Sequence, residues 1–497
     1  MDKFKNIKLN RENSQHLYIQ LSNAIKKMIV TGELEPDTKL PPIRKLANKL
    51  GVNNVTIVNA YKHLENENYV YKKVGSGTFV KPKIEYQEMG LHVPIDTEFN
   101  SVGNDSKLIN YDIITNDVTI NFASGMPTPD LFPVSDFKKA LNEILDTDKG
   151  NAFGYQESQG FYPLRCSIKN YIKSYNIDSE TENIQIISGA QQGIDIISKA
   201  LIDYGDVVFI ESPTYRGAIA SFKSRSARII EIPIQEDGIN IKSLENKLKV
   251  FTPKFIYVMP NFQNPTGYTY SNNKKEKLLD LAKKYDFYII EDDYLSELSF
   301  NNLKGFPLKS IDKYDRVIYI KSFSKIFMPG LRLGFMIFPL SVYNDVISAK
   351  HVSDISTSGL IQRTFNLYLR KGIWQKHIQY MQTIYKKRFQ IMTNSLNKYL
   401  PKQVHINLPK GGLNFWISLP NGFSSNELYN LCIKNNIVIV PGSVFYKDKN
   451  DSNYFRLNTA SVYTEQIDEG IKKLSNILIQ FLKIYGNKEL RPTTPLL

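Results

Sequence analysis

The stretch "DRVIYIKSFSKIFMPGLRLGF", residues 315–335, decides how the large part of this chain folds. Its first half is a short run of β-branched and aromatic residues, and its second half carries Lys325 and Arg332. Such a run is typical of a strand that a parallel sheet buries on both faces. Because α/β proteins place functional groups at the carboxyl ends of strands, we expect Lys325 at the opening of a site.

The residues that follow this strand suggest a particular chemistry. Burial can lower the pKa of a lysine, so that its amine loses its proton, attacks a carbonyl carbon and forms a Schiff base. The hydroxyl group of Ser322 and the planar fork of Arg332 suit a phosphate group nearby. Together these residues predict a site for pyridoxal phosphate. The stretch alone is equally compatible with a strand and loop of purely structural role.

Length and composition predict a globular protein of several domains. The chain has 497 residues, of which 42% are hydrophobic and 23% are charged, so two or three domains are expected. No apolar run approaches the ~20 residues that span a bilayer, and the first residues lack the apolar core of a signal peptide. We therefore expect a cytoplasmic protein without a membrane partner. Cys166 and Cys432 lack metal-ligand spacing, so both are expected to be reduced and no metal site is predicted.

The positive charge of the chain is concentrated near its start. The net charge is +14, and residues 1–83 contain 15 Lys and Arg against 7 Asp and Glu. A basic N-terminal module indicates a polyanionic partner, although a compositional bias toward Lys, Asn and Ile is the alternative explanation.

The hydrophobic pattern divides the chain into three parts. Residues 10–82 alternate helical patterns with short turns, and residues 83–118 show no sustained period and predict a linker. Residues 119–485 alternate β-rich runs with helical stretches, which predicts a large doubly wound α/β part. One long helix over 364–400 and the runs "GGLNFWISL" and "NIVIVPG" then predict a smaller α+β part.

The N-terminal part has the pattern of a winged helix-turn-helix. The stretch "LYIQLSNAIKKMIVTGEL" predicts an amphipathic helix, and residues 40–70 predict two short helices that meet at Gly51. The stretch "YVYKKVGSGTFV" predicts a β-hairpin. The second helix of the pair would enter the major groove of DNA, while Lys72 and Lys73 of the hairpin would contact phosphates.

Over these residues the sequence resembles the GntR family of bacterial transcription regulators. The resemblance implies that Arg44 and Thr56 contact DNA and that Gly75 to Gly77 form the tip of the wing. The sequence departs from the family at Asn53 and Asn54, where Ser-Arg is common. Without that arginine, either Asn54 reads a base edge by itself, or affinity is lower and depends on Lys49, Lys62 and the wing.

Four more stretches of the large part end a strand with residues suited to pyridoxal phosphate. The glycine-containing turn before Ala190 and Gln191 opens a helix whose amides can bind a phosphate. Tyr215 could stack on the ring, and Asn264 could hold its phenolic oxygen. An acid in "IIEDDYLSE" would pair with the protonated pyridine nitrogen. The stretches are "ISGAQQG" at 187–193, "ESPTY" at 211–215, "MPNFQNPTG" at 259–267 and "IIEDDYLSE" at 289–297.

In order and spacing, these stretches resemble the fold type I aminotransferases from about residue 120 to 480. The resemblance implies that Lys325 is the Schiff-base lysine and that Asp292 holds the pyridine nitrogen, with Asp293 as the alternative. It also implies partners for the phosphate, the ring and the substrate. Ser322, Arg332, Ala190 and Gln191 would bind the phosphate, Tyr215, Asn264 and Tyr294 would contact the ring, Tyr155 would reach the neighbouring subunit's phosphate, and Arg456 and Gly125 would contact the substrate.

A GntR-type winged helix linked to an aminotransferase-like domain is the arrangement of the MocR (GabR-like) regulators. This resemblance implies a homodimer that binds double-stranded operator DNA and senses an amino-acid or amine effector through pyridoxal phosphate. Two alternatives stay open at this stage. The protein could be a working aminotransferase that also binds DNA, or a regulator that senses pyridoxal phosphate itself.

Overall fold

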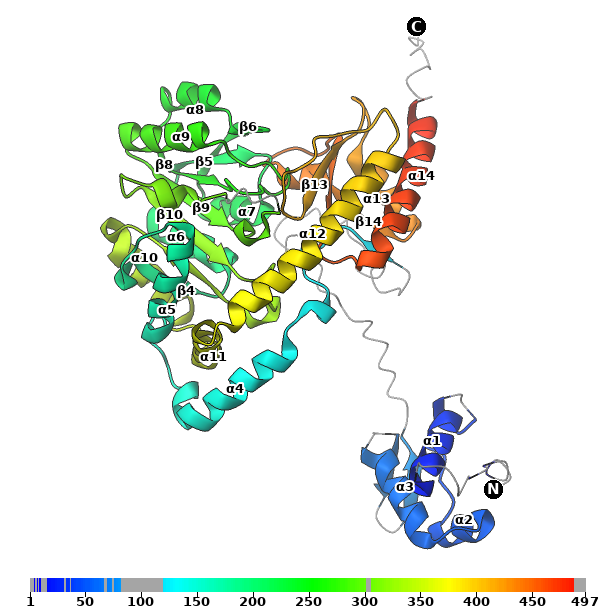
Figure 1. Ribbon diagram of the computed structural model, residues 1–497. Coiled ribbons are helices and arrows are strands. Elements are labelled where there is room, and N and C mark those ends of the chain that lie inside the picture. Colours follow the sequence, from blue (N-terminus) through cyan, green and yellow to red (C-terminus); the bar gives the residue numbers. More distant parts are fainter. Residues whose placement is uncertain are drawn as a thin grey trace. The chain divides into compact units, whose positions relative to one another are not determined.

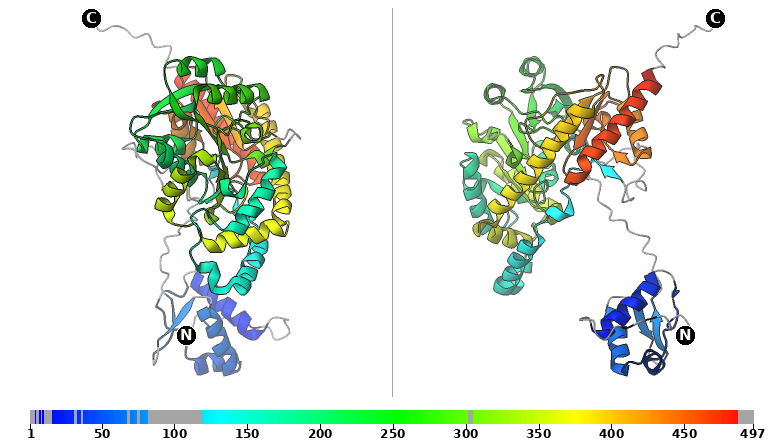
Figure 2. Two further views of the ribbon diagram at one scale, coloured as in Figure 1. Left: turned by 90° about the vertical axis from the view of Figure 1, so that its left-hand side faces the viewer. Right: turned by 45° about the vertical axis from the view of Figure 1, so that its right-hand side comes forward.

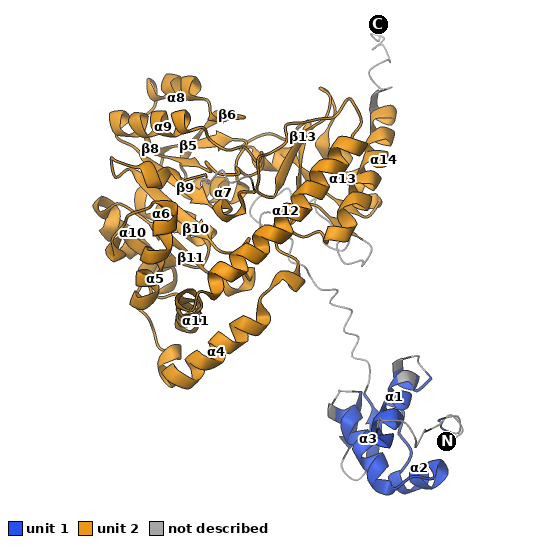
Figure 3. Ribbon diagram, viewed as in Figure 1, with its two compact units in different colours: residues 1–92 blue, residues 93–497 orange. Residues whose placement is uncertain are grey.

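The computed structural model describes two compact units, Met1–His92 and Val93–Leu497 (Figure 3). The described residues are 4, 7, 9, 16–30, 33–35, 37–66, 69–73, 76–81, 119–300 and 305–486. The predicted linker, residues 83–118, lies outside them, and so does Gly75.

The N-terminal unit is a winged helix-turn-helix, as predicted. Its elements are α1 Leu17–Val30, α2 Ile43–Leu50, α3 Asn54–Asn66, β1 Val70–Lys73 and β2 Gly77–Val80 (Figure 1). The two strands pair in antiparallel register. Gly51 ends α2 in the left-handed conformation, with φ 62°, which glycine adopts at no steric cost. Apolar side chains from all three helices, among them Leu21, Leu46 and Ile57, close the core of this unit.

The large part of the second unit is built on an eight-stranded sheet in the order β4-β11-β10-β9-β8-β5-β6-β7. The strands from β10 through β6 pair in parallel, whereas β11 is antiparallel to both of its neighbours. The carboxyl ends of β4, β5, β8, β9 and β10 therefore share one edge. The bounds are β4 Ile184–Ile187, β5 Val207–Ser212, β6 Arg228–Gln235, β7 Gly238–Ile239, β8 Pro253–Val258, β9 Tyr288–Asp293, β10 Val317–Ser322 and β11 Gly334–Ile337.

Helices cover both faces of this sheet (Figure 1). Successive strand residues point to opposite faces, so Ile289 joins one hydrophobic core and Ile290 joins another. The core that contains Ile290 is closed by α6 Ala190–Leu201, α7 Arg216–Ser224 and α10 Tyr343–Asp354. The core that contains Ile289 is closed by α8 Ile241–Leu248 and α9 Asn272–Tyr285. This doubly wound arrangement confirms the predicted fold class.

A smaller α+β part follows, built on the antiparallel strands β12 His405–Ile406, β13 Asn414–Ser418, β16 Tyr454–Asn458 and β15 Val440–Pro441. Early in the unit, β3 Ile120–Asn121 pairs in parallel with β14 Ile437–Val438, so distant stretches of the chain complete this part. Figure 2 shows β3, in cyan, among the orange and red elements. The helices here are α12 Ile373–Tyr399, α13 Ser425–Lys434 and α14 Ile467–Gly486.

The single helix predicted over 364–400 is wrong, because the chain forms two helices there. The first, α11, spans Gly359–Arg370, and α12 begins at Ile373, after Gly372 with φ 68°. The break lets Phe365 of α11 and Trp374 of α12 pack against the same ring, that of Phe323, at centroid distances of 4.8 and 5.2 Å. Aromatic packing outweighs the helical periodicity at this point. The remaining helices, α4 Val134–Asp148 and α5 Tyr162–Ile172, contribute to the same core.

Among the helices that the structure describes, none has both the length and the apolar character needed to cross a bilayer.

Candidate functional site

A cavity of about 490 Å³ opens at the shared carboxyl edge of the large sheet. Most of the residues predicted for a cofactor line it, although they come from five separate strand ends. The lining consists of Met126, Ala190, Gln191, Tyr215, Met259, Asn264, Asp292, Tyr294, Ser322, Ser324, Lys325, Pro329, Gly330 and Arg332.

Lys325 is held in this lining by the aromatic cluster beneath it. The rings of Phe323 and Phe327, on either side of the lysine, contact Trp374 at centroid distances of 5.2 and 5.5 Å. The imidazole Nε2 of His377 lies 2.6 Å from the carbonyl oxygen of Ile326. A loop packed in this way has little freedom, so the amine of Lys325 is kept at the cavity.

Asp292 presents a carboxylate oxygen that lacks a hydrogen-bond partner within the described residues. The hydroxyl of Tyr257 donates to Oδ2 at 2.6 Å, while the buried Oδ1 has no partner. Burial raises the pKa of Asp292 to about 6, against the opposing effects of the Tyr257 hydrogen bond and of Lys321 and Lys325. An orphaned buried acceptor is costly, so Oδ1 suits a cationic donor inside the cavity.

Asp293 lies on the opposite face of β9 and is already fully engaged. Its Oδ1 accepts the backbone N–H of Ser296 at 3.0 Å, and its Oδ2 accepts the hydroxyl of Tyr319 at 2.6 Å. The buried ammonium of Lys321 lies 3.4 Å from the same carboxylate. Of the two neighbouring acids, the geometry favours Asp292 as the partner of a ligand in the cavity.

A second region of the cavity gathers groups that suit a phosphate. Helix α6 begins at Ala190 directly after Gly189, so its first N–H groups are directed toward this end of the cavity. Arg332 has a left-handed backbone, with φ 51°, and its Nη2 donates to the carbonyl oxygen of Ser188 at 2.8 Å. The hydroxyl oxygens of Ser322 and Ser324 lie 3.1 Å apart.

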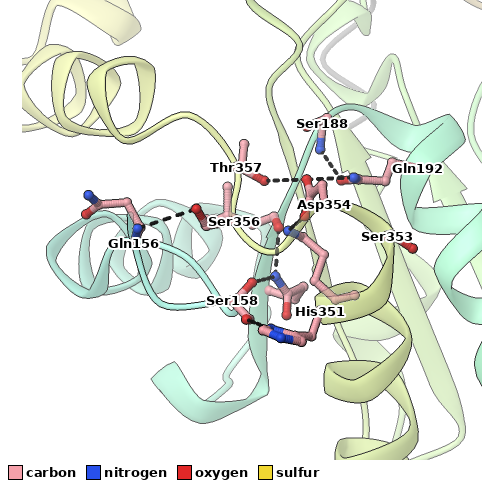
Figure 4. Close-up of polar contacts among 12 residues, drawn as sticks. Gln156, Ser158, Ser188, Gln192, His351, Ser353, Asp354, Ser356 and Thr357 are labelled. Carbon is pink, nitrogen blue, oxygen red and sulfur yellow. Dashed lines mark hydrogen bonds and ion pairs between the residues drawn. The ribbon is translucent and has the colours of Figure 1, made fainter. Parts of the chain in front are cut away.

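Polar contacts outside the cavity hold this turn in place (Figure 4). The backbone N–H of Ser188 donates to the side-chain oxygen of Gln192 at 2.7 Å, and the amide nitrogen of Gln192 donates to Oδ2 of Asp354 at 2.8 Å. Lys350 forms an ion pair with the same aspartate. The α6 turn is thereby tied to the end of α10.

The predicted substrate arginine, Arg456, is buried and is not among the residues that line the cavity. Its Nη1 donates to Oδ1 of Asn264 at 2.8 Å, and its Nη2 donates to the carbonyl oxygen of Ala123 at 2.7 Å. Gly125 is also absent from the lining, where the adjacent Met126 lies instead. Arg456 is therefore hydrogen-bonded to a residue of the cavity lining, Asn264.

The tyrosines predicted for the site have different surroundings. The hydroxyl of Tyr215 donates to the side-chain oxygen of Gln191 at 3.0 Å. The hydroxyl of Tyr294 donates to the carbonyl oxygen of Phe262 at 2.7 Å and accepts from Asn414 at 2.8 Å. Tyr155 is 87% exposed and does not line the cavity.

The sequence patterns did not identify several residues that line the cavity or contact its lining. Ser324 stands next to Lys325 in "SFSK" and could have been inferred from the loop that carries the lysine. Tyr257, which binds Asp292, left no sequence signal, because a tyrosine within an apolar strand reads as a core residue. Met126 and Met259 enter only because the tertiary fold brings their loops together.

The residues predicted to contact DNA are mostly at the surface of the N-terminal unit. Arg44, Asn54 and Lys73 are exposed, and Thr56 is half-buried. Lys72 is exposed as well, but its ammonium lies 2.6 Å from the carboxylate of Glu65. An exposed ion pair of this kind contributes little, so it leaves Lys72 able to bind a phosphate.

Residues 117–474 match the family described as aminotransferase class I and II. The chain belongs to this family. Residues 17–80 match the gntR family of bacterial regulatory proteins, so a GntR-type regulator domain is fused to an aminotransferase-like domain. This fusion confirms the predicted MocR-like arrangement.

Known proteins resemble either the second unit or nearly the whole chain. Aromatic-amino-acid aminotransferase 1 of Thermococcus litoralis is 31% identical over 81% of this chain and 97% of its own length. The uncharacterized HTH-type transcriptional regulator YdfD of Bacillus subtilis is 28% identical over 92% of this chain and 95% of its own. The crystal structure of LysN, an alpha-aminoadipate aminotransferase of Thermus thermophilus complexed with N-(5'-phosphopyridoxyl)-L-leucine, has a TM-score of 0.70 and 32% identity, covering 74% of this chain and 94% of that one.

Within the described residues, no group of three or more His, Cys, Asp or Glu side chains could hold a metal ion.

We predict that Asp292→Asn stabilises the cofactor-free protein at high pH. The pKa of Asp292 is raised from 3.8 to about 6 by folding, so the wild-type protein loses stability as pH rises from about 4 to about 6. The asparagine amide stays neutral between pH 4 and pH 8, so the variant should gain up to about 3 kcal/mol of stability at pH 8 and nothing at pH 4. Urea unfolding of both proteins at the two pH values measures the difference.

Asp293→Asn is the matched control, because it leaves Lys321 with one carboxylate fewer and should destabilise the protein at pH 8. Equal stability of wild type and Asp292→Asn at pH 8 would contradict the conclusion that ionisation of the buried Asp292 destabilises the folded protein.

We predict that Gly189→Ala weakens the binding of pyridoxal phosphate about tenfold, the effect of losing one charge-assisted hydrogen bond. A Cβ at Gly189 would lie 2.8 Å from Nη2 of Arg332, so it would displace the guanidinium. Gly205→Ala is the control, because Gly205 has a similar φ, 83° against 87°, and no atom near the added Cβ. Both variants should lose similar stability, and fluorescence titration should show weaker binding only for Gly189→Ala. Equal affinity in the two variants would argue against a role of Arg332.

Proposed function

We propose that this protein is a DNA-binding transcription regulator whose aminotransferase-like domain binds pyridoxal phosphate and senses an amino-acid or amine effector. The observation that carries the proposal is the cavity that joins Lys325, the orphaned Oδ1 of Asp292 and Arg332, in a chain that also contains a GntR-type domain. Such a regulator would act in the cytoplasm, where its DNA is.

The groups around the cavity fit the cofactor chemically. When bound, pyridoxal phosphate supplies an aldehyde with which amines condense, so that one amine can replace another, and a ring that withdraws electrons. Oδ1 of Asp292 would accept the N–H of the protonated pyridine, which would also favour the charged carboxylate. Ser322, Arg332 and the first amides of α6, at Ala190 and Gln191, would bind the phosphate, and Lys325 would hold the aldehyde end. The phosphopyridoxyl group in the related LysN structure supports this fit.

Tyr215, Asn264 and Tyr294 would contact the ring from the rest of the lining. Asn264 would then stand between the cofactor and Arg456, because its Oδ1 accepts a hydrogen bond from that guanidinium. A carboxylate on the effector could replace Asn264 and the Ala123 carbonyl as the partner of Arg456, since a guanidinium binds a carboxylate with two parallel hydrogen bonds. Met126, and Gly125 beside it, would then face the effector. This exchange gives the effector a direct means of changing contacts within the domain.

We further propose that the second unit forms a homodimer through the surface around Tyr155. Phe153, Tyr155, Val352 and Ile355 are 69%, 87%, 81% and 53% exposed. Their two segments are adjacent, because the backbone N–H of Gln156 donates to the hydroxyl of Ser356 at 3.4 Å (Figure 4). Exposed apolar residues gathered in this way are typical of interaction surfaces. Tyr155 would then reach the partner's cavity, and two GntR-type units would be available for two half-sites or direct repeats.

The effector can change DNA binding only by the difference of its affinity for two arrangements of the protein. A coupling free energy of about 1–3 kcal/mol corresponds to a change of about five- to 150-fold in DNA affinity.

We predict that Lys325→Ala abolishes the visible absorbance of the protein with pyridoxal phosphate and the covalent labelling by borohydride. The alanine variant has no amine at the cavity with which an aldehyde can condense. Lys313→Ala, at an exposed position, is the control and should behave like wild type. Absorbance spectra and mass spectrometry of peptides check the result. A wild-type protein that stays colourless and unlabelled at Lys325 would refute the proposal.

A second candidate function is turnover, since Lys325, Asp292 and Arg332 lie together as an aminotransferase would require, and the chain is 31% identical to a named aminotransferase. Purified protein mixed with amino acids and an oxo acid separates the two. Many turnovers per active site would favour the enzyme, whereas a spectral change without turnover, together with altered DNA affinity, is expected for the sensor. DNA affinity that responds to reversible binding of pyridoxal phosphate alone would identify a regulator of the cofactor itself.

A further inference from the structure

The outward face of α3 in the N-terminal unit has an unusual composition for a helix expected to bind DNA. Its inward face is apolar, with Ile57, Ala60 and Leu64 fully buried. At helical spacing, the residues on the other side are exposed. They are Asn54, Val55, Val58, Asn59 and Lys62.

This face offers two amides, two isopropyl groups and one ammonium, but no guanidinium and no carboxylate. Val55 is 59% exposed and Val58 is 43% exposed, so neither serves the core of the unit. The amide of Asn53 is engaged at the start of the helix, where its Oδ1 accepts the backbone N–H of Val55 at 3.1 Å. Asn54 is therefore the first amide of α3 that is directed outward.

These side chains match one kind of base pair in the major groove. An asparagine amide can pair with N6 and N7 of adenine, and an apolar side chain contacts the methyl group of thymine. Guanine is read by arginine or lysine and cytosine by a carboxylate, and of these groups the face offers only Lys62, at its end farther from Asn54. The guanidinium that the structure describes in this unit, that of Arg44, belongs to α2.

We propose that α3 reads A·T base pairs in the major groove of double-stranded DNA, with Asn54 and Asn59 on adenines and Val55 and Val58 against thymine methyl groups. Lys62, one turn further along the helix, would contact the phosphate backbone. This inference rests on the proposed DNA-binding function and specifies its ligand. The basic excess of residues 1–83, 15 Lys and Arg against 7 Asp and Glu, complements the charge of the duplex.

The test is selection of bound duplexes from a randomised library by the full-length protein, in parallel with Asn54→Arg. In sites selected by the wild type, the positions that change in the variant should be A·T. In the variant, one of them should become G·C with guanine toward the new arginine. Replacing A·T by G·C at that position should weaken wild-type binding about five- to 150-fold, and the variant should show the reverse preference.

Asn48→Arg is the matched control, because it adds the same charge at an exposed position of α2. It should raise affinity for all duplexes without changing the selected bases, and thermal unfolding should be unchanged in both variants. Selected wild-type sites with G·C at the positions altered by Asn54→Arg would overturn the inference while leaving the proposed function intact. Binding without any selected sequence, as expected if Val55 and Val58 were a protein contact, would also overturn it. Failure to retain any duplex would refute the DNA-binding function itself.

Discussion

The alternation of side chains at the end of β9 is the constraint on which the second unit depends. Two carboxylates follow one another there, at Asp292 and Asp293, and the strand directs them to opposite faces. Two buried charges would be prohibitive without partners. On one face, the ammonium of Lys321 and the hydroxyl of Tyr319 compensate Asp293. On the other face, Tyr257 donates a hydrogen bond to one carboxylate oxygen of Asp292. The other oxygen has no partner within the described residues, so a ligand in the cavity can donate to it.

The aromatic cluster beneath Lys325 holds the loop that carries this lysine in place. Phe323 and Phe327 come from the lysine loop, whereas Phe365 and Trp374 come from two helices separated by Gly372. Packing of this density restricts the loop at little polar cost. As a result, an acid from one strand and an amine from the loop after its neighbour line the same cavity. The interior of the protein thus supplies rigidity, and the cavity edge supplies the chemistry.

The two units present different kinds of recognition surface. The cavity of the second unit opens at the edge of the large sheet and combines apolar and polar side chains in its lining, as small-molecule sites do. The N-terminal unit presents an exposed helix face. The order of amides and isopropyl groups along this face is what we propose to select the base pairs. A regulator needs both kinds of surface, and the coupling between them depends on free-energy differences between arrangements of the protein.

By itself, the sequence determined the winged helix, the doubly wound sheet and the strand ends that carry the cavity, because periodicity and turn residues are local properties. It also identified most of the lining, from Ala190 and Gln191 to Arg332. Only the tertiary structure decided that the stretch 364–400 breaks at Gly372, that Asp292 faces the cavity, that Tyr257 donates a hydrogen bond to Asp292 and that Arg456 donates one to Asn264. These features depend on contacts between residues far apart in the chain, and local pattern carries no information about which distant side chain will occupy a given space.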